Sequence, residues 1–77
     1  MTVEHFEANR RYRAESLIAQ IHCLEIAAHL GVVRLQVTPD IPEENKRKMV
    51  DGIAKLFEQV AELAEVLNDL AAEAPPQ

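Results

Sequence analysis

Two histidines, a cysteine and a glutamate stand close together in the segment IHCLEIAAH. Such side chains bind metal ions or act as acids, bases and nucleophiles. His22, Glu25 and His29, here called the His strip, are spaced i, i+3 and i+7, so on a helix they share one edge and neighbours meet across a turn. Zinc needs three or four ligands, and the second half of the chain contributes no histidine. The strip predicts a solvated polar edge or, as the alternative, a metal-binding helical bundle completed by a second copy.

The other candidates for chemistry are weaker. Cys23 lies about 100° around a helix from His22, on an apolar side, so we expect a small packed residue. A nucleophilic cysteine would need access and a lowered pKa. The chain contains no Gly-rich phosphate loop, Ser-His-Asp set, CxxC pair or HExxH motif. We therefore predict no catalytic residue, no cofactor and no enzyme activity.

The composition limits the partners and the compartment. The 77 residues suit a single domain, and the net charge of −5 disfavours nucleic acid, whose phosphates attract lysine and arginine. The N-terminal MTVEHFEANRR does not read as a signal peptide, and no run of consecutive apolar residues approaches the ~18 of a membrane span. One cysteine excludes an internal disulfide and is typical of a reducing compartment. We expect a cytoplasmic protein that binds neither nucleic acid nor membrane.

Glycines and prolines divide the chain into two long helices. Thr2 can cap the first helix, and Gly31 suits the left-handed residue that follows a helix end. Asp40 can cap the second helix, with Glu43 at the spacing of a capping box. The predicted bounds are helix 1 over about 2–30, a connector over 31–40, helix 2 over about 41–73, a single domain over 1–74 and a tail over 75–77.

The connector has a strand-like pattern. Val33, Leu35 and Val37 alternate with Arg34 and Gln36. A single strand has no partner within this chain. The segment is therefore expected to be a loop that tucks its apolar side onto the helices, or a strand that pairs across an oligomer.

Apolar spacing predicts how the helices pack. Helix 2 carries one seam with alternating three- and four-residue spacing: Ile53, Leu56, Val60, Leu63, Leu67 and Leu70. Phe57 is expected to widen this seam, and Gly52 to allow close approach of another backbone. Helix 1 carries two stripes on nearly opposite sides, the first with Ala14, Leu17, Ile18, Ile21, Leu24 and Ala28, and the second with Ala8, Tyr12, Ala19, Cys23, Ile26 and Leu30.

One partner helix can cover only one stripe of helix 1. The sequence therefore predicts an all-α antiparallel helical hairpin that dimerises into a coiled-coil-like four-helix bundle. The basic run Arg10–Arg13 is expected to lie beside the acidic face of helix 2, at Glu62, Glu65 and Asp69. Lys46–Lys48 and Arg34 are expected to form a contact surface at the loop end.

These features indicate a small protein-interaction module that acts as a homodimer, as an adaptor, a chaperone-like subunit or an inhibitor of another protein. The alternatives are the metal-binding bundle and an accessory subunit of a larger enzyme complex. The candidate interface residues are Tyr12, Ala19, Cys23, Ile26, Leu30, Val33, Arg34 and Leu35.

Overall fold

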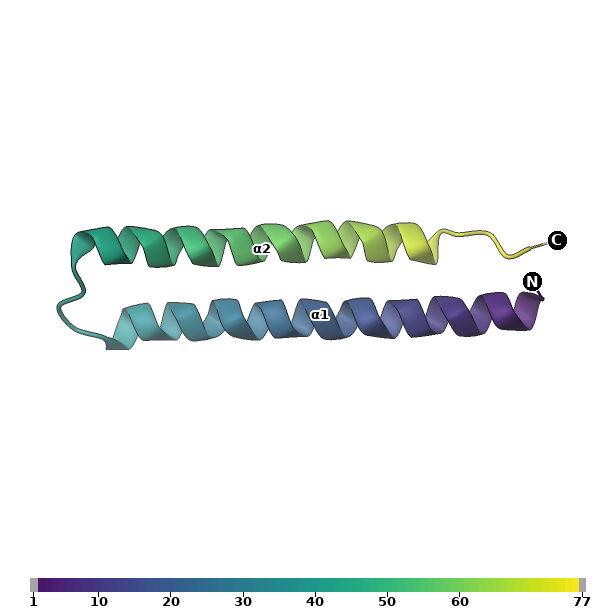
Figure 1. Cartoon of the computed structure of the whole chain (residues 1–77), viewed down its shortest axis with the longest axis horizontal. Coiled ribbons are helices and arrows are strands. Elements are labelled where there is room, and N and C mark those ends of the chain that lie inside the picture. Colours follow the sequence, from purple (N-terminus) through teal and green to yellow (C-terminus); the bar gives the residue numbers. More distant parts are fainter. Residues whose placement is uncertain (1, 77) are drawn as a thin grey trace.

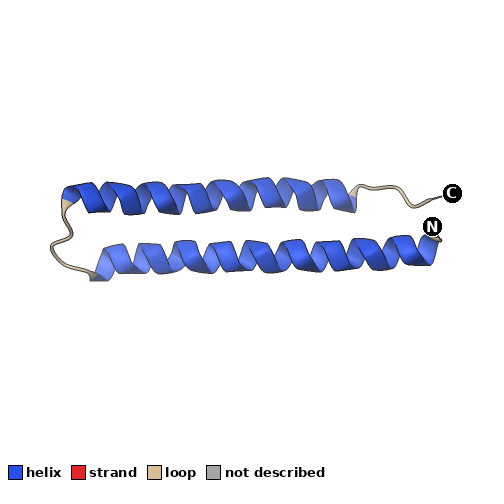
Figure 2. Cartoon of the chain, in the orientation of Figure 1, coloured by secondary structure: helices blue, strands red, loops and turns tan. Residues whose placement is uncertain are grey.

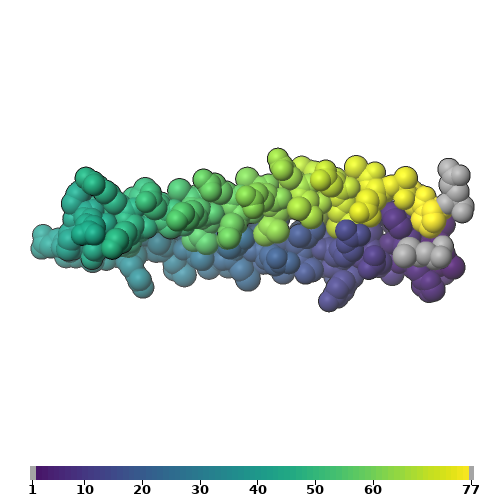
Figure 3. Space-filling view, turned by 45° about the horizontal axis from the view of Figure 1, so that its top comes forward, coloured from purple at the N-terminus to yellow at the C-terminus, as the bar shows by residue number. Residues whose placement is uncertain are grey.

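The computed structural model describes residues 2–76, so the two end residues of the predicted domain and tail lie outside it. Helix α1 spans Val3–Val37 and helix α2 spans Glu43–Ala71. The two helices lie side by side and antiparallel, joined by one short turn, with both chain ends at the opposite end of the hairpin (Figure 1, Figure 2). The all-α helical hairpin is confirmed. The molecule is rod-shaped (Figure 3). Its principal-axis extents are 61 × 15 × 12 Å.

The predicted cap of the first helix is confirmed. Thr2 has an extended backbone, and its hydroxyl oxygen accepts a hydrogen bond from the His5 backbone N–H at 3.0 Å. Glu4 lies in the first turn, where a negative charge suits the positive end of the helix dipole. A polar cap thus defines where α1 begins.

Helix α1 continues seven residues beyond the predicted end near Leu30. Both predictions for the connector, a loop and a paired strand, are wrong, because the chain is helical as far as Val37. Val32 and Leu35 continue the helical apolar spacing from Ala28 and are half-buried. Packing along α2 therefore outweighs the β-propensity of valine in this segment.

Gly31 serves helix packing and not helix termination. It lies within α1, and no glycine of the described residues has a positive φ. A Cβ atom at Gly31 would lie 3.0 Å from Cγ1 of Ile53, whereas a Cβ atom at Gly52 would meet nothing within 4 Å. Within the hairpin the close approach is therefore at Gly31, and the expectation that Gly52 would provide it is wrong.

The turn differs from the predicted capping box. Asp40 has a φ of 58°, in the left-handed region that aspartate tolerates better than most residues. An N-cap residue needs an extended backbone, so Asp40 does not cap α2. The N-cap is Pro42, which makes no side-chain cap hydrogen bond. Asp40 instead reverses the chain between the helices.

The core is one continuous seam between the two helices. All six predicted seam residues of α2 are buried or half-buried. Phe57 is 52% exposed, so its expected place in the core is wrong. On α1 the residues that face α2 also alternate by four and three positions, and we call them the inner seam: Arg10, Ala14, Leu17, Ile21, Leu24, Ala28, Gly31 and Leu35.

The inner seam contains most of the first predicted stripe, but Ile18 is exposed beside it. Among the described residues only Ala28 and Leu70 are classed as buried. A single hairpin therefore buries little apolar surface for its length, and much of α1 is left uncovered.

Candidate interaction surface

The opposite side of α1 carries a second regular seam. It lies two positions along the chain from the inner seam, which is about 200° around the helix. We call it the outer seam, and its members alternate by four and three positions: Tyr12, Ser16, Ala19, Cys23, Ile26, Leu30, Val33 and Val37. At 1.5 Å per residue it runs for about 37 Å.

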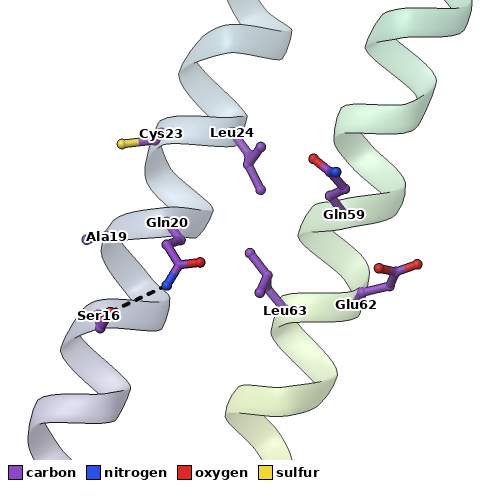
Figure 4. Close-up of a pocket in the computed structure, with 8 residues that line it drawn as sticks. All are labelled: Ser16, Ala19, Gln20, Cys23, Leu24, Gln59, Glu62 and Leu63. Carbon is purple, nitrogen blue, oxygen red and sulfur yellow. Dashed lines mark hydrogen bonds between the residues drawn. The ribbon is translucent and has the colours of Figure 1, made fainter.

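Every residue of the outer seam is exposed. Tyr12 is 73%, Val37 70% and Leu30 63% accessible. In Figure 4 the side chains of Ala19 and Cys23 point away from α2, while Leu24 points into the space between the helices. Soluble monomers rarely leave so long an apolar strip uncovered. The outer seam is therefore the main candidate site of the hairpin.

Sequence reasoning found only part of this seam. It included Tyr12, Cys23 and Leu30 in the second stripe, but it ended helix 1 before Val37. The same spacing continues through Val33 to Val37, which was the signal for a longer helix. Of the predicted interface residues, Leu35 does not belong to the open face, because it lies on the inner seam and is half-buried.

The expected packing of Cys23 is not found within one hairpin. Its thiol is free and exposed, because α2 covers only the other side of α1. Cys23 could be packed only by something that binds the outer seam.

A shallow groove runs between the helices beside the outer seam. One part, of about 620 Å³, has Leu24 and Leu63 pointing into it, with Gln59 and Glu62 of α2 on its far side (Figure 4). The Gln20 side-chain amide donates a hydrogen bond to the Ser16 hydroxyl oxygen at 3.4 Å along its near edge. A second part, of about 580 Å³, extends from Ala27 past Gly52. The groove is open and mainly apolar.

The His strip lies along the edge of α1 between the two seams. His22, Glu25 and His29 are all exposed. Across residues 2–76 no group of three or more histidine, cysteine, aspartate or glutamate residues is placed to hold a metal ion. A metal site on this strip would therefore need ligands from another molecule.

The basic run at the start of α1 forms charge pairs, but not with the expected partners. Arg13 Nη1 lies 3.5 Å from a carboxylate oxygen of Glu73, beyond the end of α2. The expected partners Glu62, Glu65 and Asp69 form no ion pair among the described residues. The antiparallel overlap of the helices places the start of α1 beside the very end of α2, which explains the difference.

Arg10 closes this end of the hairpin. Its Nη2 donates to both carboxylate oxygens of Glu7 at 2.7 and 2.8 Å, and its Nη1 donates to the backbone carbonyl of Glu73 at 3.1 Å. Its guanidinium group lies 5.1 Å from the centre of the Phe6 ring. The half-buried Arg10 thus has a structural role at the end of the inner seam.

The loop end carries a separate basic surface. Lys46, Arg47 and Lys48 are exposed in the first turns of α2, and Arg34 is exposed near the end of α1. Lys48 pairs only loosely with Glu44, at 3.6 Å between two well-exposed side chains. Such exposed pairs contribute little to stability, so this surface is available to a partner.

The composition of α1 has one further consequence. Helix α1 contains an 18-residue window with a mean hydropathy of 1.5, long and apolar enough to cross a membrane. No run of consecutive apolar residues reveals this, because polar side chains such as Gln20 and Glu25 interrupt it. Core helices of soluble proteins and signal sequences near the N-terminus also meet this criterion. Only 6% of this window is buried within the hairpin.

Comparison with known proteins identifies neither a family nor a relative of this chain. No protein-family model, curated protein or solved structure matches the chain. The function must therefore be inferred from the two seams and the charges around them.

Proposed function

We propose that the protein is a small protein–protein interaction module that works as a homodimer, with the outer seam as the dimer interface. The observation that carries this proposal is the continuous exposure of the outer seam over about seven turns of α1. Heptad spacing of this kind is the signature of a helix that packs against another helix. Binding to another helix is therefore the function that the outer seam supports best.

Dimerisation would also add the buried apolar surface that a hairpin of this size lacks. Domains of this size gain only a few kcal/mol from one core, and here the core is a single seam. A second seam of equal length would roughly double the buried apolar surface per chain. We propose that the dimer then presents its loop ends, with Arg34 and Lys46–Lys48, to a further protein partner of acidic character.

We also propose that the protein is cytoplasmic. Cys23 is an exposed free thiol in the single hairpin. Reducing compartments keep such thiols from forming disulfides. The dimer would in addition enclose Cys23 between two copies.

Replacing Leu30 by glutamate tests the proposal. Leu30 lies in the outer seam and is 63% exposed in the single hairpin, so the substitution disturbs little packing with α2. A charge enclosed in the dimer interface without a partner would cost several kcal/mol. We expect Leu30→Glu to convert the dimer to a monomer and to lower helicity, because folding and assembly are coupled. Light scattering with size exclusion gives the mass, and circular dichroism gives the helicity.

Ala54→Glu is the matched control. Ala54 is exposed on α2, away from the outer seam, and the substitution introduces the same charge. We expect this variant to keep the mass and helicity of the unmodified protein. The proposal fails if the unmodified protein is already a stable helical monomer at micromolar concentration.

A further inference from the structure

The outer seam has a size gradient along its length. Its first half after Tyr12 holds small side chains, namely Ser16, Ala19 and Cys23. Its second half holds only branched apolar side chains, namely Ile26, Leu30, Val33 and Val37. A surface of this kind is complementary to its own copy in one orientation only.

We infer that two copies join their outer seams in antiparallel orientation, so that each small residue faces a large one. This inference rests on the proposed homodimer and specifies its geometry. The facing pairs are Cys23 with Ile26, Ala19 with Leu30, Ser16 with Val33, and Tyr12 with Val37, each formed twice across the two-fold axis.

The packing argument excludes the parallel alternative. In a parallel pair equal positions face one another, so Ser16, Ala19 and Cys23 would each meet their own copy. Three successive layers of small residues would leave voids, which close-packed interfaces avoid because each void loses contacts. In the antiparallel register no layer pairs two small residues.

The heptad positions agree with this register. Tyr12, Ala19, Ile26 and Val33 repeat every seven residues, and so do Ser16, Cys23, Leu30 and Val37. These two sets are the two core positions of a heptad. Each facing pair in the antiparallel register takes one residue from each set. All eight seam residues of each copy therefore have a facing residue in the other copy.

The charges also favour a second copy as the occupant. Between Leu17 and Val33 the only charged residue of α1 is Glu25, so this part of the seam presents no charge array that would select an acidic or basic foreign helix. The one like-charged pair that the register brings to the same flank is Arg13 with Arg34 of the second copy. Arg13 already has Glu73 at 3.5 Å, which offsets that repulsion.

The net negative charge of the protein does not oppose this dimer. Residues 49–77 contain six acids and one lysine, which accounts for the whole net charge of −5. Most of this segment is helix α2, which ends at Ala71. Because the outer seam faces away from α2, the two α1 helices separate the two α2 helices. With about 8–10 Å between neighbouring helix axes, the acidic helices lie about 25 Å apart, well beyond the Debye length of about 8 Å. The particle is therefore a flat row of four helices in the order α2, α1, α1, α2.

This arrangement also defines where further partners bind. Antiparallel pairing places the two loop ends at opposite ends of the particle. Each end carries its own copy of Arg34 and Lys46–Lys48. The dimer is thus a bivalent rod with two identical basic ends.

Disulfide trapping tests the orientation. In a Cys23→Ser parent, Ala19→Cys and Leu30→Cys are prepared as separate variants. In the antiparallel register position 19 of one copy faces position 30 of the other, whereas the two copies of position 19 lie eleven residues, or about 16 Å, apart along the axis. A disulfide needs Cα atoms within about 7 Å. After the two variants are mixed, exchanged in mild urea, refolded and oxidised, we expect cross-linked dimer in the mixture and at least tenfold less with either variant alone.

Ser16→Cys with Val33→Cys provides an independent pair, in case the loss of Leu30 weakens the dimer. Light scattering on the Cys23→Ser parent separates the outcomes. A dimeric parent whose single variants cross-link with themselves shows parallel pairing, which overturns this inference but leaves the homodimer. A dimeric parent with no cross-link in either mixture overturns the register. A monomeric parent overturns the inference and the homodimer together, and flotation with phosphatidylcholine vesicles would then identify a membrane as the occupant of the outer seam.

Discussion

Replacing Gly31 by alanine measures how tightly the two helices approach one another. Alanine in place of a helical glycine gains about 1 kcal/mol from helix propensity. At Gly31, however, the new Cβ would lie 3.0 Å from Cγ1 and 3.1 Å from Cδ1 of Ile53. Overpacking of this kind costs about 1–3 kcal/mol. We expect Gly31→Ala to lower the free energy of unfolding by about 0–2 kcal/mol, in spite of its better propensity.

Gly52→Ala is the internal reference for this prediction. Gly52 lies inside α2, and a Cβ there would meet nothing within 4 Å. This variant should therefore gain about 1 kcal/mol from propensity with no packing cost. The difference between the two alanine variants isolates the contact with Ile53. Adding Ile53→Val to Gly31→Ala removes the Cδ1 methyl and should recover part of the loss.

Urea unfolding followed by circular dichroism measures these differences. All variants must be compared at one protein concentration, because the proposed dimerisation would make apparent stability depend on concentration. In thermal scans about 1 kcal/mol corresponds to about 4–8 °C for a domain of this size. Equal stabilisation by Gly31→Ala and Gly52→Ala would refute the reasoning, since it would mean that the Ile53 side chain repacks with no loss of stability.

Two further predictions concern the chemical candidates on α1. The protein should purify without stoichiometric zinc or iron: one chain groups no three ligands across the described residues, and the antiparallel register brings only one histidine of the second copy beside each histidine of the strip, which is fewer than the three or four ligands that zinc needs; metal found by elemental analysis and lost on substituting His22 and His29 by alanine would contradict this. Cys23 should react slowly with a thiol reagent at micromolar concentration and fast in denaturant, because the proposed dimer would cover it. The Leu30→Glu variant should react fast without denaturant, and equal rates for the unmodified protein in both conditions would mean that its outer seam is open.

The hairpin could be predicted from sequence because its strongest signals are local and periodic. The seam of α2 repeats over three heptads, and apolar burial along it determines which face meets α1. The Thr2 cap depends on one residue type at one place, so it was also readable. These features need no knowledge of the rest of the chain.

The end of α1 was predicted wrongly, because local patterns conflict there. Alternating Val33, Leu35 and Val37 suit a strand and Gly31 suits a helix end, whereas the four- and three-residue spacing of the outer seam continues to Val37. The outcome depends on what lies beside the segment: Ile53 of α2 fills the space above Gly31, and α2 is long enough for Leu35 to pack along it. These contacts with α2 decided in favour of the helical spacing.

The membrane-like composition of α1 and the proposed dimerisation have one physical basis. A helix that packs against α2 on one side and a second copy on the other must be apolar on both sides, so its mean hydropathy rises to that of a membrane span. The residues between the seams distinguish the two environments. Gln20, His22, Glu25 and His29 lie outside both seams, where a dimer leaves them in water, whereas a membrane would have to bury them at a cost of several kcal/mol. Insertion of α1 into a membrane would also separate it from the acidic helix α2. The polar edges of α1 therefore favour a second protein copy over lipid.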